Sequence, residues 1–379
     1  MQAIEGYRPY FQEKETFMNS KLKDIISTME QQRWDTVLLT DPKHIYYLTG
    51  YASDPHERFL GLVLQQSCEP FLLLPALDAD VAAAASGGIC ILTHRDTDQP
   101  YDILKSRLEA PVGVLALEKS HMTLSRFEQL QETLSAHHYA DIGPLLQDMR
   151  AVKSPHEISI MKEAVRIVEQ VLTEGLRSVR PGVRELELVA ELEYLMKKSG
   201  AQAPSFDTMV LTGSHTALPH GVPGMREIQE GDLLMFDLGV YYGGYASDIT
   251  RTFAVGHLSA EARHIYDTVL AANLSAIAAV KPGVSYGSID QAARSLIEQA
   301  GYGEAFLHRL GHGLGLDVHE APFIHGLNNE LLQPGAVFTI EPGIYIPGIG
   351  GVRIEDDVWV TEQGVEILTT FPKELTVLG

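Results

Sequence analysis

Cysteine is scarce in this sequence, with only Cys68 and Cys90 among 379 residues. Two cysteines are too few for the disulfide framework of a small secreted protein, and they suit a reducing compartment. No apolar run approaches the roughly 18 residues of a membrane-spanning helix. The N-terminus also lacks the charged-then-apolar pattern of a signal peptide. We therefore expect a cytoplasmic protein without a membrane partner.

Positive charge is also in short supply. Lysine and arginine number 29 against 50 aspartates and glutamates, which gives a formal net charge of −21. Such a surface repels phosphate backbones, so no nucleic-acid partner is expected. The length and a hydrophobic content of 45% instead predict a globular protein of two domains.

The segment 231–254 predicts a β-hairpin, because two runs of apolar, aromatic and β-branched residues flank Gly243-Gly244. A two-residue loop at these glycines places Gly239 opposite Asp248. Asp237 then lies diagonally across from Asp248 on the same face. Two carboxylates on an apolar face repel each other unless a cation lies between them. The alternative is a pair of solvated aspartates at a sheet margin.

The segment 334–360 repeats this pattern. Aligned on the glycine that precedes each strand, it has Glu341 in the place of Asp237 and Glu355 in the place of Asp248. The repeat predicts that four acids from two hairpins meet in one domain.

The repeat extends upstream to two pairs of helices. Arg180-Pro-Gly-Val and Lys281-Pro-Gly-Val each follow a long helical pattern and precede a shorter one, which ends at Gly200 or Gly301. The first long helix starts with the capping box Ser154-Pro-His-Glu157. In the second unit, helices are predicted from about Ser259 to Val280 and from near Ser288.

A histidine between glycines, His312, precedes the second hairpin. Its neighbours Gly311 and Gly313 give the backbone freedom to approach an ion closely. Such a residue alone is more often an ordinary loop histidine. Beside four carboxylates, it can supply a nitrogen ligand to an oxygen-rich site.

The pita-bread metallopeptidases carry five metal ligands in an order and spacing that this chain resembles, at Asp237, Asp248, His312, Glu341 and Glu355. That family includes methionine aminopeptidase, aminopeptidase P and Xaa-Pro dipeptidase (prolidase). The resemblance covers the chain from about Met18 onward. It rests on the segments Asp248-Ile-Thr-Arg-Thr, His312-Gly-Leu-Gly, Glu341-Pro-Gly and Val352-Arg-Ile-Glu-Asp.

The resemblance implies an α/β N-terminal domain of the creatinase and prolidase type over residues 18–148. It also implies an α+β pita-bread catalytic domain with an internal pseudo-twofold repeat over residues 154–379. In the first domain the pattern predicts a helix at 19–34 and strands near 35–40, 59–64, 71–74, 89–92 and 112–117. Residues 1–17 show no clear periodicity and are interpreted as an extension, natural or introduced in cloning.

By this resemblance, Asp237 binds one metal ion, His312 and Glu341 bind a second, and Asp248 and Glu355 bridge both. Four carboxylates and one imidazole suit Mn²⁺ and tolerate Co²⁺ or Zn²⁺. Two such ions roughly 3.5–4 Å apart can share a hydroxide that attacks the scissile carbonyl.

The resemblance also assigns the remaining site residues. Catalytic roles are implied for His220, His319, Glu341 and Arg353. Substrate contacts are implied for His220, His308, His319, Tyr345 and Arg58. Arg353 shares a strand face with Glu355 and is expected to pair with a ligand carboxylate.

The implied substrate is a peptide with an Xaa-Pro bond, and three functions stay open. An Xaa-Pro dipeptidase needs a receptor for the carboxylate of its substrate, whereas an aminopeptidase P leaves that side open for longer peptides. A non-catalytic peptide-binding protein or a creatinase-like enzyme is the third. Some prolidases have an arginine where this chain has Phe323. We expect Arg58 or His56, in the polar loop 51–58, to clamp the carboxylate across a homodimer; the alternative is a solvated surface loop.

Overall fold

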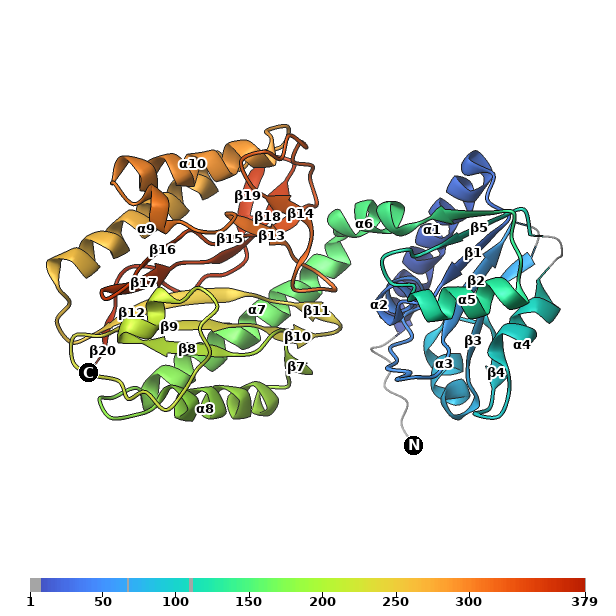
Figure 1. Cartoon of the computed structure of the whole chain (residues 1–379), viewed down its shortest axis with the longest axis horizontal. Coiled ribbons are helices and arrows are strands. Elements are labelled where there is room, and N and C mark those ends of the chain that lie inside the picture. Colours follow the sequence, from blue (N-terminus) through green and yellow to red (C-terminus); the bar gives the residue numbers. More distant parts are fainter. Residues whose placement is uncertain (1–7, 67, 109–111, 379) are drawn as a thin grey trace. The chain divides into compact units, whose positions relative to one another are not determined.

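The computed structural model describes residues 8–66, 68–108 and 112–378. It divides into two compact units, Met1–Gln147 and Asp148–Gly379, both drawn in Figure 1. Helix α6 (Gly143–Ala151) crosses the boundary between them. Among the described residues, no helix is both long and apolar enough to span a membrane.

The N-terminal unit is an α/β fold around a six-stranded sheet in the order β4-β3-β2-β1-β5-β6. Strand β1 is fully buried, pairs with β5 in parallel and pairs with β2 antiparallel. The bounds along the chain are α1 Arg8–Gln32, β1 Thr36–Leu39, α2 Pro42–Thr49, β2 Gly61–Gln65, β3 Cys68–Pro75, η1 Ala76–Asp78, α3 Ala79–Ala85, β4 Cys90–His94, α4 Pro100–Arg107, β5 Val114–Leu117, α5 Leu124–Thr133 and β6 His138–Asp141.

The predicted elements of this unit are present with shifted ends, and two differences have clear reasons. Helix α1 begins at Arg8, so residues 8–17 continue the helix that was predicted to start at Asn19. Residues 1–7 lie outside the described part. Strand β6 was missed because its residues are all exposed or half-buried and form no apolar run.

The C-terminal unit has an α+β fold in which each half combines two helices with a sheet. Helices α7 and α8 share one apolar core with β8, β9 and β12, and α9 and α10 share another with β15 and β18. Figure 1 shows the strands between α8 on one side and α9 and α10 on the other. The sheets are ordered β20-β12-β9-β8, β14-β13-β15-β18-β19, β11-β10-β7 and β16-β17.

The bounds in the first half are α7 Pro155–Gly175, η2 Leu176–Ser178, α8 Glu185–Lys198, β7 Ala203–Pro204, β8 Met209–Thr212, η3 Gly213–Ala217, β9 Leu233–Leu238, β10 Val240–Tyr242, β11 Tyr245–Ala246 and β12 Ile249–Val255. Those in the second half are α9 Ala260–Ala279, α10 Tyr286–Gln299, η4 Gly303–Ala305, β13 Gly311–Gly313, β14 Glu320–Ile324, β15 Val337–Ile340, β16 Gly343–Ile346, β17 Gly350–Arg353, β18 Asp356–Thr361, β19 Gly364–Ile367 and β20 Val377–Leu378.

Local capping explains where the helices begin. The predicted capping box is present: the Ser154 hydroxyl accepts from the Glu157 amide at 3.3 Å, and the Glu157 carboxylate accepts from the Ser154 amide at 2.8 Å. Helix α10 begins at Tyr286, earlier than predicted, because Ser285 is its N-cap and accepts from the Ser288 amide at 3.2 Å.

The internal repeat is visible in the backbone of paired glycines. Equivalent glycines adopt the same left-handed conformation: Gly182 and Gly283 have φ of 89° and 82°, Gly200 and Gly301 have 90° and 87°, and Gly231 and Gly335 have 91° and 95°. Side chains are disfavoured at such φ angles, so these turns require glycine. The two halves therefore share their turns as well as their helices and strands.

The first hairpin has the predicted register. Tyr242 pairs with Tyr245 across the Gly-Gly loop, and Asp237 pairs with Thr250. Asp237 and Asp248 consequently lie on the same face of the hairpin.

The second hairpin corrects one prediction. The ladder continues on both sides of the acids, through Ile340 with Asp356 and Gly343 with Arg353, so Glu341 lies directly opposite Glu355. Glu355 therefore takes the ladder position of Thr250, and its equivalence with Asp248 was wrong. The turn after Ile346 holds three residues instead of two, which shifts the return strand.

Candidate metal centre and catalytic cleft

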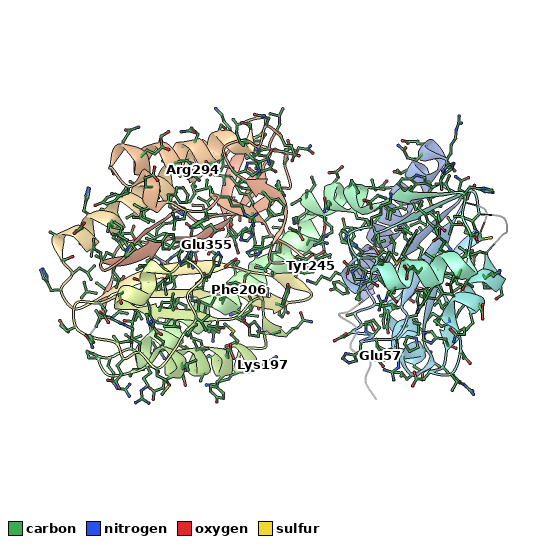
Figure 2. All side chains as sticks on the ribbon, in the orientation of Figure 1. Glu57, Lys197, Phe206, Tyr245, Arg294 and Glu355 are labelled. Atoms are coloured by element: carbon green, nitrogen blue, oxygen red, sulfur yellow. The ribbon has the colours of Figure 1, made fainter. Side chains whose placement is uncertain are left out.

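A cleft of about 710 Å³ in the C-terminal unit brings the predicted site residues together. The walls include all five predicted metal ligands: Asp237, Asp248, His312, Glu341 and Glu355. They also include His220, His308, His319 and Arg353, with Tyr345 buried behind them. Figure 2 shows Glu355 among the strands in the interior of this unit.

The donor atoms converge on one place. Asp248, His312 and Glu355 each offer one ligand atom within 4.8 Å of the others. The His312 Nε2 lies 3.4 Å from a Glu341 oxygen and 3.8 Å from an Asp248 oxygen. The second oxygen of Asp248 is buried without a hydrogen-bond partner. Because buried carboxylate oxygens are normally satisfied, this arrangement fits a divalent cation.

His312 is held in the tautomer that a metal requires. Its Nδ1–H donates to the Gly313 carbonyl at 3.1 Å, which leaves the Nε2 lone pair directed at the carboxylates. Its backbone amide donates to the Thr339 hydroxyl at 3.1 Å. A Cβ on Gly313 would lie 2.3 Å from the Ala321 carbonyl oxygen, so glycine is required for this close strand approach.

Three of the ligand carboxyls, those of Asp248, Glu341 and Glu355, resist ionisation in their buried surroundings. Burial and the charge of neighbouring acids raise the pKa of Asp248 and Glu355 well above their ordinary values. Burial raises the pKa of Glu341 to about 8, although Arg353 opposes the shift. Burial and then His319 lower the pKa of His312 to about 3, so its imidazole is neutral.

These pKa shifts predict how the stability of the metal-free protein depends on pH. Between pH 6.5 and 8 these acids still hold protons in the folded state, whereas the same acids are ionised in the unfolded state. The free energy of unfolding therefore falls as pH rises. The lowered histidine pKa values act below this window. We expect the Tm of chelated protein to fall across the window and Mn²⁺ to restore it, as thermal denaturation can measure. A flat or rising Tm in chelator contradicts the prediction.

Arg353 connects the acids to the wall of the cleft. Its buried guanidinium bonds the Asp237 carboxylate through Nη2, the Tyr345 hydroxyl at 2.7 Å and the Thr250 hydroxyl at 3.1 Å. Thr250 in turn donates to Glu355 at 2.7 Å. The guanidinium therefore neutralises one ligand carboxylate and helps to orient a second.

His319 stands beside His312 on an anchored loop. The two rings meet edge to face with centroids 4.1 Å apart. The next residue, Glu320, is buried and bonds Lys153 at 2.8 Å and Arg150. Burial and then the charge of Arg309 lower the pKa of His319, so it is a neutral donor near pH 7.

His308 and His220 lie in the same cleft. The His308 Nε2 contacts the Tyr345 hydroxyl at 2.9 Å, and its Nδ1–H donates to the Arg309 carbonyl at 2.7 Å. Burial lowers the pKa of His308 to about 4. His220 lines the cleft beside Val222 and Pro223, which sequence reasoning did not single out.

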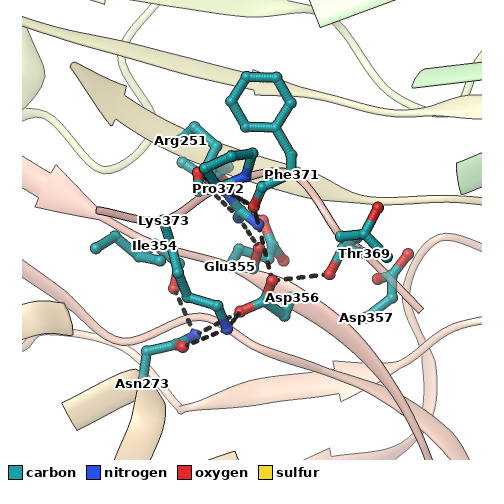
Figure 3. Close-up of polar contacts among 12 residues, drawn as sticks. Arg251, Asn273, Ile354, Glu355, Asp356, Asp357, Thr369, Phe371, Pro372 and Lys373 are labelled. Carbon is teal, nitrogen blue, oxygen red and sulfur yellow. Dashed lines mark hydrogen bonds and ion pairs between the residues drawn. The ribbon is translucent and has the colours of Figure 1, made fainter. Parts of the chain in front are cut away.

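A buried network behind the site was also missed (Figure 3). Arg251 donates to the Glu355 carbonyl and to an Asp356 oxygen at 2.9 Å. The same carboxylate of Asp356 accepts from Asn273 at 3.0 Å and from Lys373. This network fixes the backbone that carries Glu355. Arg251 and Asp356 were both within the quoted motifs, but no role was assigned to them.

Arg58 lies in the N-terminal unit, where its guanidinium already has a partner. Its Nε and Nη2 donate to the two oxygens of Asp96 at 2.8 and 3.2 Å. A substrate carboxylate would have to displace Asp96. The clamp by Arg58 stays a prediction.

Comparisons with known proteins cover both units. The pattern of Metallopeptidase family M24 matches residues 159–362, and that of the Creatinase/Prolidase N-terminal domain matches residues 21–152. A putative dipeptidase of Bacillus subtilis is 42% identical over 95% of this chain and 100% of its own length.

Two solved structures are similar over nearly the whole chain. The Xaa-Pro dipeptidase from Bacillus anthracis is 36% identical, with a TM-score of 0.90 over 95% of this chain and 100% of its own. The X-Pro aminopeptidase from Thermotoga maritima is 34% identical, with a TM-score of 0.85 over 91% of this chain and 98% of its own.

Proposed function

Because the chain belongs to metallopeptidase family M24, we propose that it is an Xaa-Pro dipeptidase that hydrolyses the bond before proline in dipeptides. The main support is one cleft in which four carboxylates and a neutral imidazole meet three further histidines. The full-length similarity to an Xaa-Pro dipeptidase favours this substrate class. The donor set suits two divalent ions, and its oxygen-rich character favours Mn²⁺ over Zn²⁺.

In the proposed metal site, Asp237 would hold one ion and His312 with Glu341 would hold the second, while Asp248 and Glu355 would be ligands to both. When bound, divalent ions supply Lewis acidity that polarises a peptide carbonyl. Arg353 holds Asp237 in place through its buried ion pair.

The remaining cleft residues act on the peptide. Neutral His319 would donate an N–H to the oxygen that becomes negative as the carbonyl turns tetrahedral. His220 and His308 would position the peptide, and Tyr345 orients His308 through its hydroxyl. Burial raises the pKa of Tyr345 to about 12, so this hydroxyl keeps its proton.

Peptide hydrolysis tests the proposal directly. We expect Mn²⁺-loaded protein to cleave Ala-Pro, to leave Ala-Ala nearly untouched and to lose activity on chelation. Free proline can be measured by a colorimetric or chromatographic assay. Full activity after exhaustive chelation, or equal cleavage of Ala-Ala, contradicts the proposal.

An Xaa-Pro aminopeptidase is the second candidate, since the Thermotoga maritima enzyme is also similar over most of its length. The two candidates differ on Ala-Pro-Ala, which an aminopeptidase cleaves as readily as Ala-Pro. Efficient cleavage of the tripeptide would therefore favour the second candidate.

Further parts of the proposal concern the assembly and its compartment. We propose a homodimer by resemblance to prolidase-type members. A cytoplasmic location is proposed because the chain has only two cysteines, as suits a reducing compartment.

A further inference from the structure

Arg309 is a cation on the wall of the cleft that no described residue of the chain neutralises. It lies between His308 and β13, in the wall that also contains Glu341 and His319. Among the described residues, none accepts a hydrogen bond from its guanidinium or forms an ion pair with it. Arg353, the other arginine of the cleft, is committed to Asp237. The donors of Arg309 are thus available to a ligand.

The guanidinium is held in place by stacking. Its central carbon lies 4.4 Å from the centroid of the Phe323 ring, which is 41% exposed. Stacking on an aromatic face leaves the N–H groups at the edge of the guanidinium plane free to bind a carboxylate bidentately. Phe323 pairs directly with His312 across β14 and β13. The ring therefore fixes the cation relative to the proposed metal site.

The charge of Arg309 acts within the same cleft as the acids. It lowers the pKa of His319, after burial, and it opposes the rise in the pKa of Glu341 that burial causes. Arg309 thus places a positive charge in the same cleft as the four carboxylates, where it is suited to an anionic group of a ligand.

We propose that Arg309, supported by Phe323, receives the C-terminal carboxylate of the dipeptide substrate. This proposal rests on the proposed function and identifies a residue that sets its specificity. A bidentate contact between guanidinium and carboxylate is a charge-assisted hydrogen bond. It should favour a free carboxylate over an amide by roughly tenfold to a hundredfold. A longer peptide has a neutral amide at this position and loses the contact.

The test compares Ala-Pro, Ala-Pro-amide and Ala-Pro-Ala as substrates of the Mn²⁺-loaded full chain. The wild type should show a kcat/KM roughly tenfold to a hundredfold higher for Ala-Pro than for its amide. Arg309→Gln should remove that preference, mainly through a higher KM for Ala-Pro, with metal content unchanged. Arg309→Lys should restore part of it, because lysine keeps the charge but lacks the planar fork.

Two further variants separate stacking and general charge from recognition. Phe323→Leu keeps the cation without its aromatic support and should weaken the preference less than Arg309→Gln. Arg263→Gln is the matched control, since it removes an exposed arginine of α9 that pairs with Asp267 outside the cleft. This control should leave the preference unchanged. Product inhibition by free proline, but not by prolinamide, should weaken in Arg309→Gln.

The outcomes are distinguishable. If the wild type cleaves no Xaa-Pro peptide, the proposed function itself fails, and this inference fails with it. If the wild type cleaves Ala-Pro and its amide equally well, the carboxylate receptor is wrong and the proposed function stands. Equal loss of activity on both substrates in Arg309→Gln also overturns the inference, because it indicates a structural or general electrostatic role.

Discussion

Replacing Glu355 with glutamine is expected to abolish metal binding and hydrolysis together. Glu355 is one of three residues whose donor atoms converge within 4.8 Å, and it is the proposed bridge between both ions. Glutamine keeps the size of the side chain but removes the negative charge. Loss of Lewis-acid activation is worth several kcal/mol, so activity should fall by about 10³-fold or more. Metal analysis should find about two ions per chain in the wild type and almost none in the variant.

Stability measurements distinguish this loss from misfolding. Burial and the charges of Glu341 and Asp237 raise the pKa of Glu355, so removing its charge should relieve repulsion in the metal-free protein. Metal-free Glu355→Gln should therefore be at least as stable as metal-free wild type near pH 8. Added Mn²⁺ should stabilise only the wild type. Glu366→Gln, at the partly exposed ion pair with Lys162, is the matched control. A variant that keeps two ions and full activity would refute the assignment.

Replacing His319 with alanine is expected to lower kcat by roughly 10²–10³ while metal content stays unchanged. That factor is typical for the loss of one donor to a developing oxyanion. The ring lies beside His312, but the donor cluster does not include it. The lowered pKa keeps the imidazole neutral near pH 7, so it offers an N–H without adding a charge.

The contrast between kcat and KM tests the role of His319. A transition-state donor changes kcat and kcat/KM together, whereas a residue that only binds the ground state changes KM. His319→Gln, which keeps an N–H donor, should recover part of the rate. Loss of metal in His319→Ala, or a change confined to KM, would show that the role is misassigned.

The carboxylates of the first hairpin could be predicted from the sequence because the features that place them are close together in the chain. Gly243-Gly244 set the register of the first hairpin, and the strand pairs around it confirm that register. Alternation along the strands then placed Asp237 and Asp248 on one face. The equivalence of Glu355 with Asp248 was wrong because it matched acid with acid: it needs three added residues, and the second turn has only one more than the first.

Other features depend on contacts between distant segments. Arg309 becomes distinctive only because the fold brings the ring of Phe323 beneath it. Likewise, the partner of Arg58 is Asp96, and a separation of 38 positions in the sequence gives no local signal for this pair. Strand β6 lacks the apolar run that identifies a buried strand. Such features follow from topology rather than from composition or periodicity.

The network behind Glu355 also constrains when the site can form during synthesis. The Arg251 guanidinium donates to the carbonyl of Phe371, which lies 120 residues later in the chain. At about 5–20 residues per second, a ribosome needs roughly 6–24 s to cover that distance. Asp356, whose carboxylate also accepts from Arg251, lies 105 residues after it, so both partners are synthesised long after the arginine. During that time, the first hairpin lacks the partners of Arg251 and the acids of the second half. The metal site can therefore form only after the strands of the second half have been synthesised.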